Sequence, residues 1–423
     1  MRHLRFHIHI LLMISALSLM AGEYSWILPG STQLTSSFCE YRVGHFHAGM
    51  DLRTPQGVGM KIHAPCDGDI MRATVSPWGY GLALYYRCPG DFITVYAHLS
   101  KFSSAVQQRV RQEQYRKSKY PVNIWFKEGE IPVKAGEVIA YTGDTGAGSP
   151  HLHFETRLGM SKYINPFLMG FTVEDRVMPK IQGVYITPTG NDAYIEGYSE
   201  ALGYRQIDPE GNSPRYTISD TIKVHGEIGF SVRAFDWQAD GNPNRMGIYE
   251  LFLISSDRTL YYAKYDSFLF DDTRQVGHAF DLFCEEWGGN RYHRLYRKDF
   301  LSAFPFLLTQ EGGGTVSPQP GEVMPLRVVA RDFFGNTAEL TMTIKGVEKP
   351  TKAGFTLGLY DWGGAIVKPH WLPMAELEMV ISTDGGNTWK YFEERREKDY
   401  ISFRGKPGDM IRMAYSQQDG LKR

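Results

Sequence analysis

The chain has 423 residues, of which 42% are hydrophobic and 22% charged, with 46 Lys and Arg against 47 Asp and Glu. A chain of this length is too long to form a single typical hydrophobic core, which predicts roughly two to four domains. The formal net charge of -1 excludes the overall basic excess of a general nucleic-acid-binding protein, so no nucleic-acid partner is expected. The 25 Tyr and 24 Phe favour a strand-rich fold.

The N-terminus has the pattern of a secretory signal peptide. Arg2 and Arg5 precede an apolar run at residues 8–20, which ends in small residues. The alternative is a membrane anchor, but about 13 apolar residues fall short of the ~20 that span a bilayer. We therefore predict a signal peptide at residues 1–22, no stable membrane span after its cleavage, and export to the periplasm or the extracellular side of the envelope.

Export permits disulfides among the four cysteines, Cys39, Cys66, Cys88 and Cys284. Cys66 and Cys88 flank a predicted hairpin that turns at "SPWGYG", so a bridge across it is one candidate. Four cysteines allow three full pairings, and the sequence leaves the choice open. No CxxC spacing is present, so zinc held by cysteines is not expected.

The chain is predicted to be mainly β throughout. Residues 23–172 alternate short apolar runs such as "FITVYAHL" with glycines, which predicts one compact β-domain. A polar stretch at residues 103–123 lacks internal glycine and predicts a helical insertion. Residues 173–347 have predicted strands at the spacing of an immunoglobulin-like β-sandwich, and residues 348–423 are expected to form a small β-domain. Its "STDGGNTWK" is a single Asp-box-like hairpin, expected to be a structural turn because a propeller needs several copies.

One segment, "HFHAGMD", places His47 and Asp51 four residues apart. On a helix two residues at this spacing would lie on one face, but the surrounding glycines favour a strand that passes into a tight turn. Gly49 would let the backbone fold back and present both side chains to one point.

A second segment, "GSPHLHFE", carries two histidines in a predicted strand. Residues two apart in a strand project to the same face, so His151 and His153 are expected to point inward together. Leu152 and Phe154 would then pack on the other side. The same rule predicts that two residues of "TVYAHL", the tyrosine and the histidine, share one face.

Histidine and aspartate are suitable zinc ligands. A hydrolytic zinc site uses about three protein ligands and leaves a position for water, whereas a structural site is closed by four. Two histidines and one carboxylate leave enough positive charge on the metal to activate water.

The order "HFHAGMD", "YAHL" and "VKAGEVIAYTGDTGAGSPHLHFE" resembles the LytM or lysostaphin-type zinc metallopeptidases, peptidase family M23, which cut peptide cross-links of bacterial peptidoglycan. The resemblance spans residues 44–166. It extends to a longer subgroup in which an M23 domain comes first and β-domains follow. A LytM-like β-domain is therefore implied at the N-terminal end, with an insertion after "YAHL" that simple members lack.

The resemblance implies one Zn(2+) per chain, held by His47, Asp51 and His153. It implies two further active-site histidines, His98 and His151, that do not bind the metal. These imidazoles would take and pass protons during peptide hydrolysis, and the sequence does not say which is the general base.

Two residues next to these motifs each have two alternative roles. Glu155 is expected at a solvated strand end, the alternative being that it orients an imidazole. Tyr96 is either an oxyanion donor or a core residue.

The function implied is a zinc-dependent endopeptidase acting on peptidoglycan peptides. The alternative is a non-catalytic cell-wall-binding or regulatory protein with an M23-like groove. A resemblance to biotinyl and lipoyl carriers is set aside because Lys134 lacks the context of a modified lysine. The later β-domains would position the enzyme on the wall, bind an envelope partner or cover the active site. The cross-link that is cut and the oligomeric state are left open.

Overall fold

The computed structural model describes residues 24–349, apart from gaps at 191, 198–200, 206, 212, 282–290, 298–304 and 309–311, and beyond residue 353 it describes strands alone. The expected signal peptide and all but the first residue of the Asp-box-like segment lie outside the described residues. Among the described helices, none has the length and apolar character needed to cross a bilayer. The strands far outnumber the helices, which confirms the mainly β fold class.

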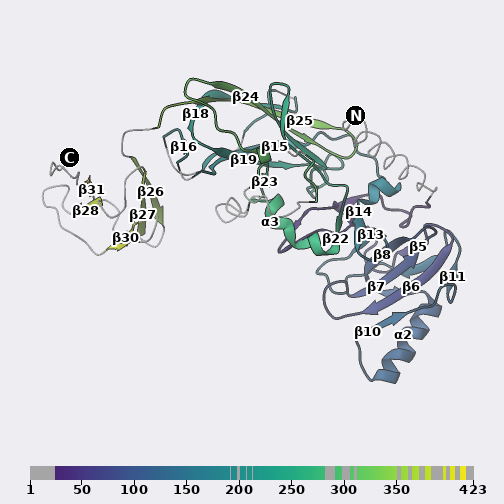
Figure 1. Ribbon diagram of the computed structural model, residues 1–423. Helices are drawn as coiled ribbons and strands as arrows, with labels where there is room; N and C mark the ends of the chain where they lie inside the picture. Colours follow the sequence, from purple (N-terminus) through teal and green to yellow (C-terminus); the bar gives the residue numbers. More distant parts are fainter. Residues whose placement is uncertain are drawn as a thin grey trace, which may run out of the picture.

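The first body, at the lower right of Figure 1, is built on a large, mostly antiparallel sheet. Its strands run in the order β1 (Leu34–Ser36), β4 (Met50–Arg53), β13 (His151–Leu158), β8 (Phe92–Leu99), β7 (Leu82–Arg87), β6 (Gly68–Val75) and β10 (Val122–Trp125), with β11 (Pro132–Val133) also on β6. A smaller sheet contains β5 (Lys61–His63), β12 (Val138–Tyr141) and β9 (Lys101–Phe102). The alternating apolar residues of both sheets form one core.

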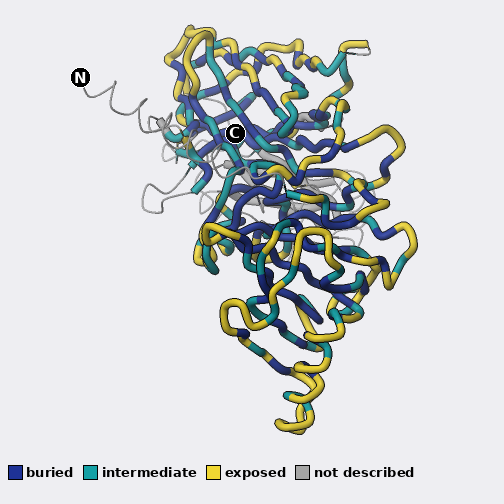
Figure 2. Tube along the Cα trace, turned by 90° about the vertical axis from the view of Figure 1, so that its right-hand side faces the viewer, coloured by how far each residue is buried: buried dark blue, intermediate teal, exposed yellow. Residues whose placement is uncertain are grey.

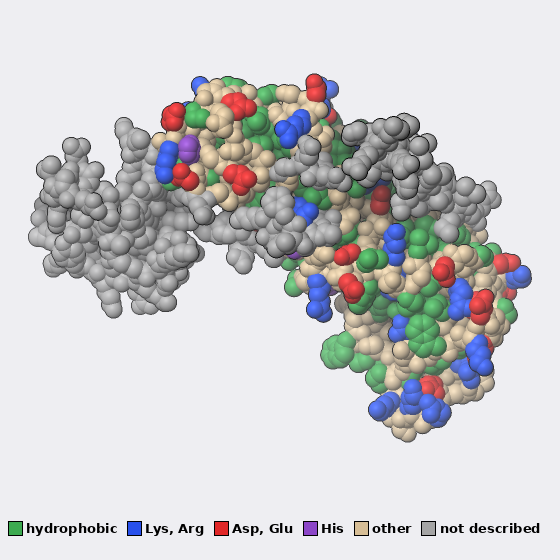
Figure 3. Space-filling view, in the orientation of Figure 1, with side chains coloured by type: hydrophobic (Ala, Val, Ile, Leu, Met, Phe, Trp, Pro, Cys, Tyr) green, Lys and Arg blue, Asp and Glu red, His purple; other side chains and the backbone are tan. Residues whose placement is uncertain are grey.

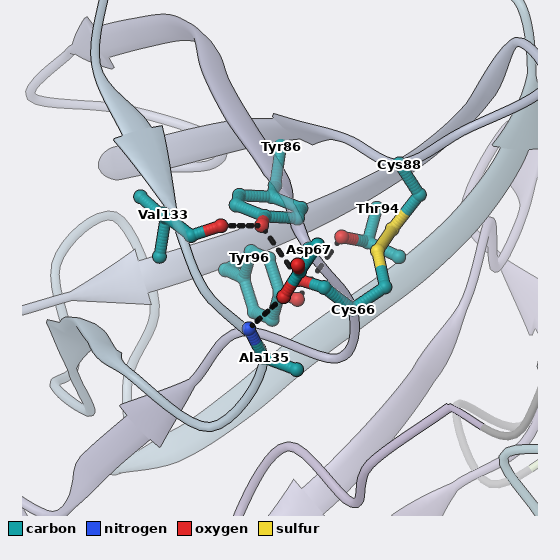
Figure 4. Close-up of a disulfide and its surroundings, with 8 residues drawn as sticks. All are labelled: Cys66, Asp67, Tyr86, Cys88, Thr94, Tyr96, Val133 and Ala135. Carbon is teal, nitrogen blue, oxygen red and sulfur yellow. Dashed lines mark hydrogen bonds between the residues drawn. A yellow bond between two sulfur atoms is a disulfide. The ribbon is translucent and has the colours of Figure 1, made fainter.

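A disulfide joins Cys66 to Cys88, one of the pairings that the sequence left open. The two cysteines flank the predicted hairpin, which is formed by β6 and β7. Figure 4 shows Tyr86 to the side of the bridge, and its hydroxyl donates to the carbonyl of Cys66 at 2.8 Å. The bridge therefore closes the open end of the hairpin, next to the hydrogen bond of Tyr86.

The predicted helical insertion contains α2 (Ser104–Lys117). Val106 and Val110 are its buried residues, and Ser118 ends it in a left-handed conformation. The helix protrudes from the body, and its far end is exposed and carries clustered Lys and Arg side chains (Figures 2 and 3). The helix ends at Lys117, before the predicted end of the insertion, and the last two residues of the insertion belong to β10, which pairs with β6.

The second body consists of two sheets around one apolar core. One sheet contains β17 (Leu202–Arg205), β15 (Lys180–Pro188), β19 (Ile228–Phe235) and β23 (His293–Arg294). The other contains β16 (Tyr194–Ile195), β18 (Arg215–His225), β25 (Thr337–Gly346), β24 (Val323–Arg331), β20 (Glu250–Ser255) and β21 (Arg258–Lys264). The arrangement is a sandwich, although β18 runs parallel to β25.

The two bodies share structure at their junction. Strand β14 (Lys162–Ile164) of the first body pairs with β22 (Ser267–Leu269) of the second. The hairpin of β2 (Tyr41–Arg42) and β3 (His45–Phe46) precedes the metal-site motif, yet its apolar residues belong to the sandwich core. Phe46 contacts Phe268 and Phe306, with ring centroids 5.7 and 5.2 Å apart. The sandwich thus anchors a segment of the first body.

At the C-terminal end, the strands form two small antiparallel sheets. One contains β26 (Gly354–Tyr360), β27 (Gly364–His370), β30 (Ile401–Arg404) and β29 (Glu394–Arg396), and the other pairs β28 (Leu377–Ser382) with β31 (Met410–Tyr415). The remaining short elements are helical: η1 (Pro166–Met169), η2 (Phe270–Gln275), α3 (Val276–Ala279) and η3 (Gly312–Gly314).

The junction yields a stability prediction. Phe268→Ala should lower the free energy of unfolding by about 3–5 kcal/mol, because it removes a buried ring that packs against both bodies. Phe270→Ala is the matched control, since that ring is 58% exposed against 2% for Phe268, and it should change stability by less than about 0.5 kcal/mol. Urea denaturation followed by tyrosine and tryptophan fluorescence measures both, and equal effects of the two substitutions would contradict the shared core.

Candidate metal centre

The register of β4 against β13 brings the two predicted motifs together. His153 lies directly opposite Asp51 in this antiparallel pair, and β13 is covered on its other edge by β8. A Cβ atom at Gly49 would lie 2.1 Å from the carbonyl oxygen of Phe154. Gly49 is therefore required because β13 approaches its backbone closely, rather than for the fold-back that the sequence suggested.

The three predicted ligands converge on one point. His47 Nε2 lies 3.1 Å from Asp51 Oδ1 and 3.0 Å from His153 Nδ1, and His153 Nδ1 lies 2.9 Å from Asp51 Oδ1. All three residues are buried, with 5, 8 and 5% exposure respectively. Two imidazole nitrogens and one carboxylate oxygen thus form a nearly equilateral triangle.

This donor set fits zinc. Ligands about 2.0–2.1 Å from a tetrahedral zinc ion lie about 3.3 Å from one another, close to the spacing of the triangle. Nitrogen and carboxylate donors in a set of three are the composition of an open zinc site. The residues present are therefore suited to hold one ion and leave a coordination position free.

The ring nitrogens that face away from the triangle have their own acceptors. His47 Nδ1 lies 2.7 Å from the carbonyl oxygen of Ser37, and His153 Nε2 lies 2.9 Å from Glu155 Oε1. Because these oxygens accept hydrogen bonds, the outer nitrogens carry the protons in the neutral rings. The inner nitrogens then present their lone pairs to the metal position.

Glu155 is completely buried, so its expected place at a solvated strand end is wrong. It follows His153 by two residues in β13 and stays on the same face. Arg157, two residues further, donates from Nε to Glu155 Oε2 at 2.7 Å, and the hydroxyl of Tyr80 donates to Oε1. The partners on both oxygens explain how a carboxylate can be buried there and hold the His153 ring in place.

The charges of this cluster shift its pKa values strongly. Burial lowers the pKa of His153, but hydrogen bonds and charge from Asp51 and Glu155 outweigh burial and raise it to about 9. Burial raises the pKa of Glu155, yet Arg157 and His153 bring it down to about 2. Burial also opposes ionisation of Asp51, whose pKa the two histidines hold well below its usual value. Both carboxylates are therefore ionised at neutral pH.

The two histidines expected outside the ligand set lie beside it. The rings of His98 and His151 are 4.7 Å apart, and His98 is 5.8 Å from the ring of His153. Each Nδ1 faces a backbone carbonyl oxygen, that of Thr145 at 3.0 Å for His98 and that of Ser149 at 2.8 Å for His151. This leaves each Nε2 as the acceptor nitrogen.

The expectation that Tyr96 and His98 share a face is wrong. His98 has a φ of 59°, which breaks the alternation of β8 and turns its ring toward His151. Tyr96 is completely buried on the opposite face, where its ring packs 5.4 Å from that of Phe154. Of its two alternatives, the structure selects core packing.

Other residues near the triangle carried no clear sequence signal. Arg42, in β2, lies 3.4 Å from Asp51 Oδ2 and donates to the hydroxyl of Ser36 at 2.6 Å. Tyr80 comes from the turn between β6 and β7. Only Arg157 had a findable signal, because alternation from His153 through Glu155 places it on the same face of one strand.

Comparison with known proteins gives one family match: residues 45–115 match peptidase family M23. The chain is 34% identical over 121 residues to the DD-carboxypeptidase/endopeptidase Mpg of Neisseria meningitidis serogroup B, which covers 28% of this chain and 22% of that protein. It is 28% identical over 152 residues to the murein hydrolase activator NlpD of Salmonella dublin, covering 36% of this chain and 33% of that protein. The chain thus spans about a fifth of the length of the Neisseria relative and a third of the Salmonella one.

Among solved structures, a catalytic-domain mutant of the prophage-encoded M23 protein EnpA from Enterococcus faecalis is similar to part of this chain. The match has 22% identity and a TM-score of 0.25, and covers 34% of this chain and 97% of that one.

The buried carboxylate beside His153 yields one prediction. Glu155→Gln keeps the size of the side chain but removes the charge that holds the His153 ring, so zinc affinity should fall about 10–100-fold. Competition with a chromogenic chelator measures it. Glu113→Gln, on the partly exposed surface of α2, is the control and should bind zinc as the unaltered protein does. Unchanged affinity in Glu155→Gln would show that the carboxylate does not support the ligand.

The raised pKa of His153 yields a second prediction. In the metal-free protein the second ring proton of His153, which makes the imidazole cationic, stabilises the fold below pH 6.5. This contribution is lost as the pH rises through about 9. Zinc must displace that proton, so its affinity should rise about tenfold per pH unit between pH 6 and pH 8. Calorimetry in buffers of different ionisation enthalpy measures the released proton, and an affinity independent of pH over this interval would contradict the assignment.

Proposed function

Because this chain carries a domain of peptidase family M23, we propose that it is a zinc-dependent endopeptidase that hydrolyses peptide cross-links of bacterial peptidoglycan. One observation carries the proposal: three ligand atoms about 3 Å from one another lie beside the imidazoles of His98 and His151. The Nε2 atom of each imidazole can accept a proton. The name of the Neisseria relative, a DD-carboxypeptidase/endopeptidase, supports an endopeptidase activity.

His47, Asp51 and His153 would hold the ion, one per chain. Zinc bound there supplies the Lewis acidity that activates water and polarises a peptide carbonyl. Glu155 and the carbonyl of Ser37 fix the two ligand rings, so little reorganisation is needed when the substrate arrives.

His98 and His151 would carry the protons. Burial, followed by the charge of His153, lowers the pKa of His98 to about 4, so its ring is neutral at pH 7 and can accept a proton. His151 Nε2 lies 3.9 Å from Asp51 Oδ1, and its side chain retains 20% exposure, which lets it reach a substrate on the open side. Between them the two imidazoles can deprotonate water and protonate the leaving amine.

The proposal includes an envelope location. Cleavage of an N-terminal signal peptide would place the protein in the periplasm or outside the cell, where peptidoglycan peptides are available. The division into an M23 domain (23–172), a sandwich (173–347) and a small β-domain (348–423) remains part of this proposal, with the later domains available to an envelope partner.

A regulatory role is the second candidate, and the observation that favours it is the similarity to a murein hydrolase activator. In that case the groove would recognise wall peptides without cutting them, and the effect on the wall would need a separate hydrolase.

The test combines zinc content with release of muropeptides from purified peptidoglycan. The unaltered protein should hold about one zinc per chain and release new free amines, and His153→Ala should lose both. His98→Ala and His151→Ala should keep zinc but cleave about 100-fold to 10,000-fold more slowly.

Controls separate the two candidates. Full zinc with no cleavage, together with faster wall digestion by an added murein hydrolase, would favour the activator. Absence of zinc from the unaltered protein would end the metallopeptidase proposal.

A further inference from the structure

Three aspartates from distant parts of the chain meet at the junction of the two bodies. Asp175 lies in the segment that joins the bodies, Asp236 directly follows β19 and Asp332 directly follows β24. Each offers a carboxylate oxygen, and the three oxygens lie within 4.8 Å of one another. Strands β19 and β24 belong to opposite sheets of the sandwich, so the cluster connects both sheets to the joining segment.

One of these carboxylates has an unused oxygen. Asp236 is only 2% exposed, and its Oδ1 has no hydrogen-bond partner although it is buried. The backbone of Trp237 donates a hydrogen bond to the Asp236 carboxyl group, which leaves Oδ1 unsatisfied. The other two acids also have backbone donors: Asp175 Oδ1 accepts from the amide of Val177 at 2.9 Å, and Asp332 Oδ1 accepts from that of Asn336 at 2.8 Å. A buried carboxylate oxygen without a partner is costly unless something else satisfies it.

The cavity around the three carboxylates has a volume of about 30 Å³, which is enough room for an ion and a water. Its other polar lining comes from Ser37, Asn165 and tyrosines, and the described residues that line it include no Lys, Arg or His. No side-chain cation therefore balances three negative charges there. Burial, followed by the charge of the neighbouring aspartates, raises the pKa of Asp236 to about 9 and that of Asp175 to about 7. These raised pKa values have the same cause, because ionising carboxyl groups that lie close together without a cation is unfavourable.

We propose that Asp175, Asp236 and Asp332 bind a divalent cation, calcium by their chemistry, at the junction between the M23 domain and the sandwich. Hard oxygen donors without nitrogen or sulfur select calcium over zinc. Carboxylates also bind calcium in flexible geometry, so backbone carbonyls and water can complete the shell. The site is separate from the His47, Asp51 and His153 triangle, and it does not depend on the proposed peptidase activity.

A cation here would stabilise the junction. Leu34, Ser37 and Asn165 of the first body line the same cavity as the three aspartates. Phe167 of the first body packs against Phe333, next to Asp332, with ring centroids 5.1 Å apart. Neutralising the cluster would therefore hold the joining segment and both sheets of the sandwich against the first body.

The competing account is that the acids share protons at neutral pH and need no metal. The two accounts differ in their response to Asp236→Asn. If a cation binds, the substitution removes a ligand. If the acids are protonated, it replaces a neutral group by another neutral group of the same shape and leaves calcium without effect.

The experiment uses the full mature chain, freed of metals on a chelating resin and reloaded with one equivalent of zinc so that the histidine site is filled. Calcium chloride is then titrated by calorimetry and by thermal unfolding. At a calcium concentration about a hundredfold above Kd the Tm should rise by about 5 °C, and terbium should show luminescence sensitised by the lining Tyr249 and Tyr265.

Asp236→Asn and the half-buried Asp175→Asn should each weaken calcium binding at least about tenfold and remove most of the Tm shift. Asp281→Asn is the matched control, a buried aspartate of the sandwich that already accepts a hydrogen bond from Ser231 at 2.8 Å, and it should keep the calcium shift. No calcium binding by the unaltered protein at millimolar concentration, or equal binding by Asp236→Asn, would overturn the proposal.

Discussion

The antiparallel pairing of β4 with β13 is the constraint on which the candidate metal centre depends. In this register Asp51 faces His153 across two adjacent strands, although about a hundred residues separate them. A slip of one residue would send every side chain of β13 to the opposite face. The register is held because Leu152 and Phe154 must enter the apolar core and because the glycine at position 49 lets the strands approach. Core packing and metal-ligand geometry are thus set by the same pairing.

Two buried charged residues, Glu155 and Arg157, support His153, the candidate ligand on β13. Arg157, Glu155 and His153 occupy every second position of β13 and therefore lie on one face, where each contacts the next. Desolvating a guanidinium and a carboxylate is expensive unless they pair and find further hydrogen bonds, which the hydroxyl of Tyr80 provides. The arrangement orients the imidazole before any metal arrives, since only one ring nitrogen is left to face Asp51. The strong pKa shifts of His153 and Glu155 are consequences of this geometry.

The sandwich contributes to the first body rather than merely following it. Phe46, which immediately precedes His47, is buried in the sandwich core, and β14 extends the large sheet into β22. The position of one ligand therefore depends on packing that involves residues more than two hundred positions away. The three aspartates at the same junction place three carboxyl groups close together where the bodies meet. These features connect the stability of the later domain to the geometry of the candidate centre.

The sequence by itself predicted the strand-rich class and the helix of the insertion, because alternation and glycine placement are local properties. The order of its motifs also predicted, through the resemblance to family M23, which four histidines and one aspartate form the candidate site. The sequence could not decide the Cys66–Cys88 pairing among three, the burial of Glu155 or the left-handed turn at His98 that separates its ring from Tyr96. It also could not bring Asp175, Asp236 and Asp332 together. Those features were decided by the tertiary structure, because burial and charge pairing depend on which distant strands become neighbours, and a local pattern carries no information about that choice.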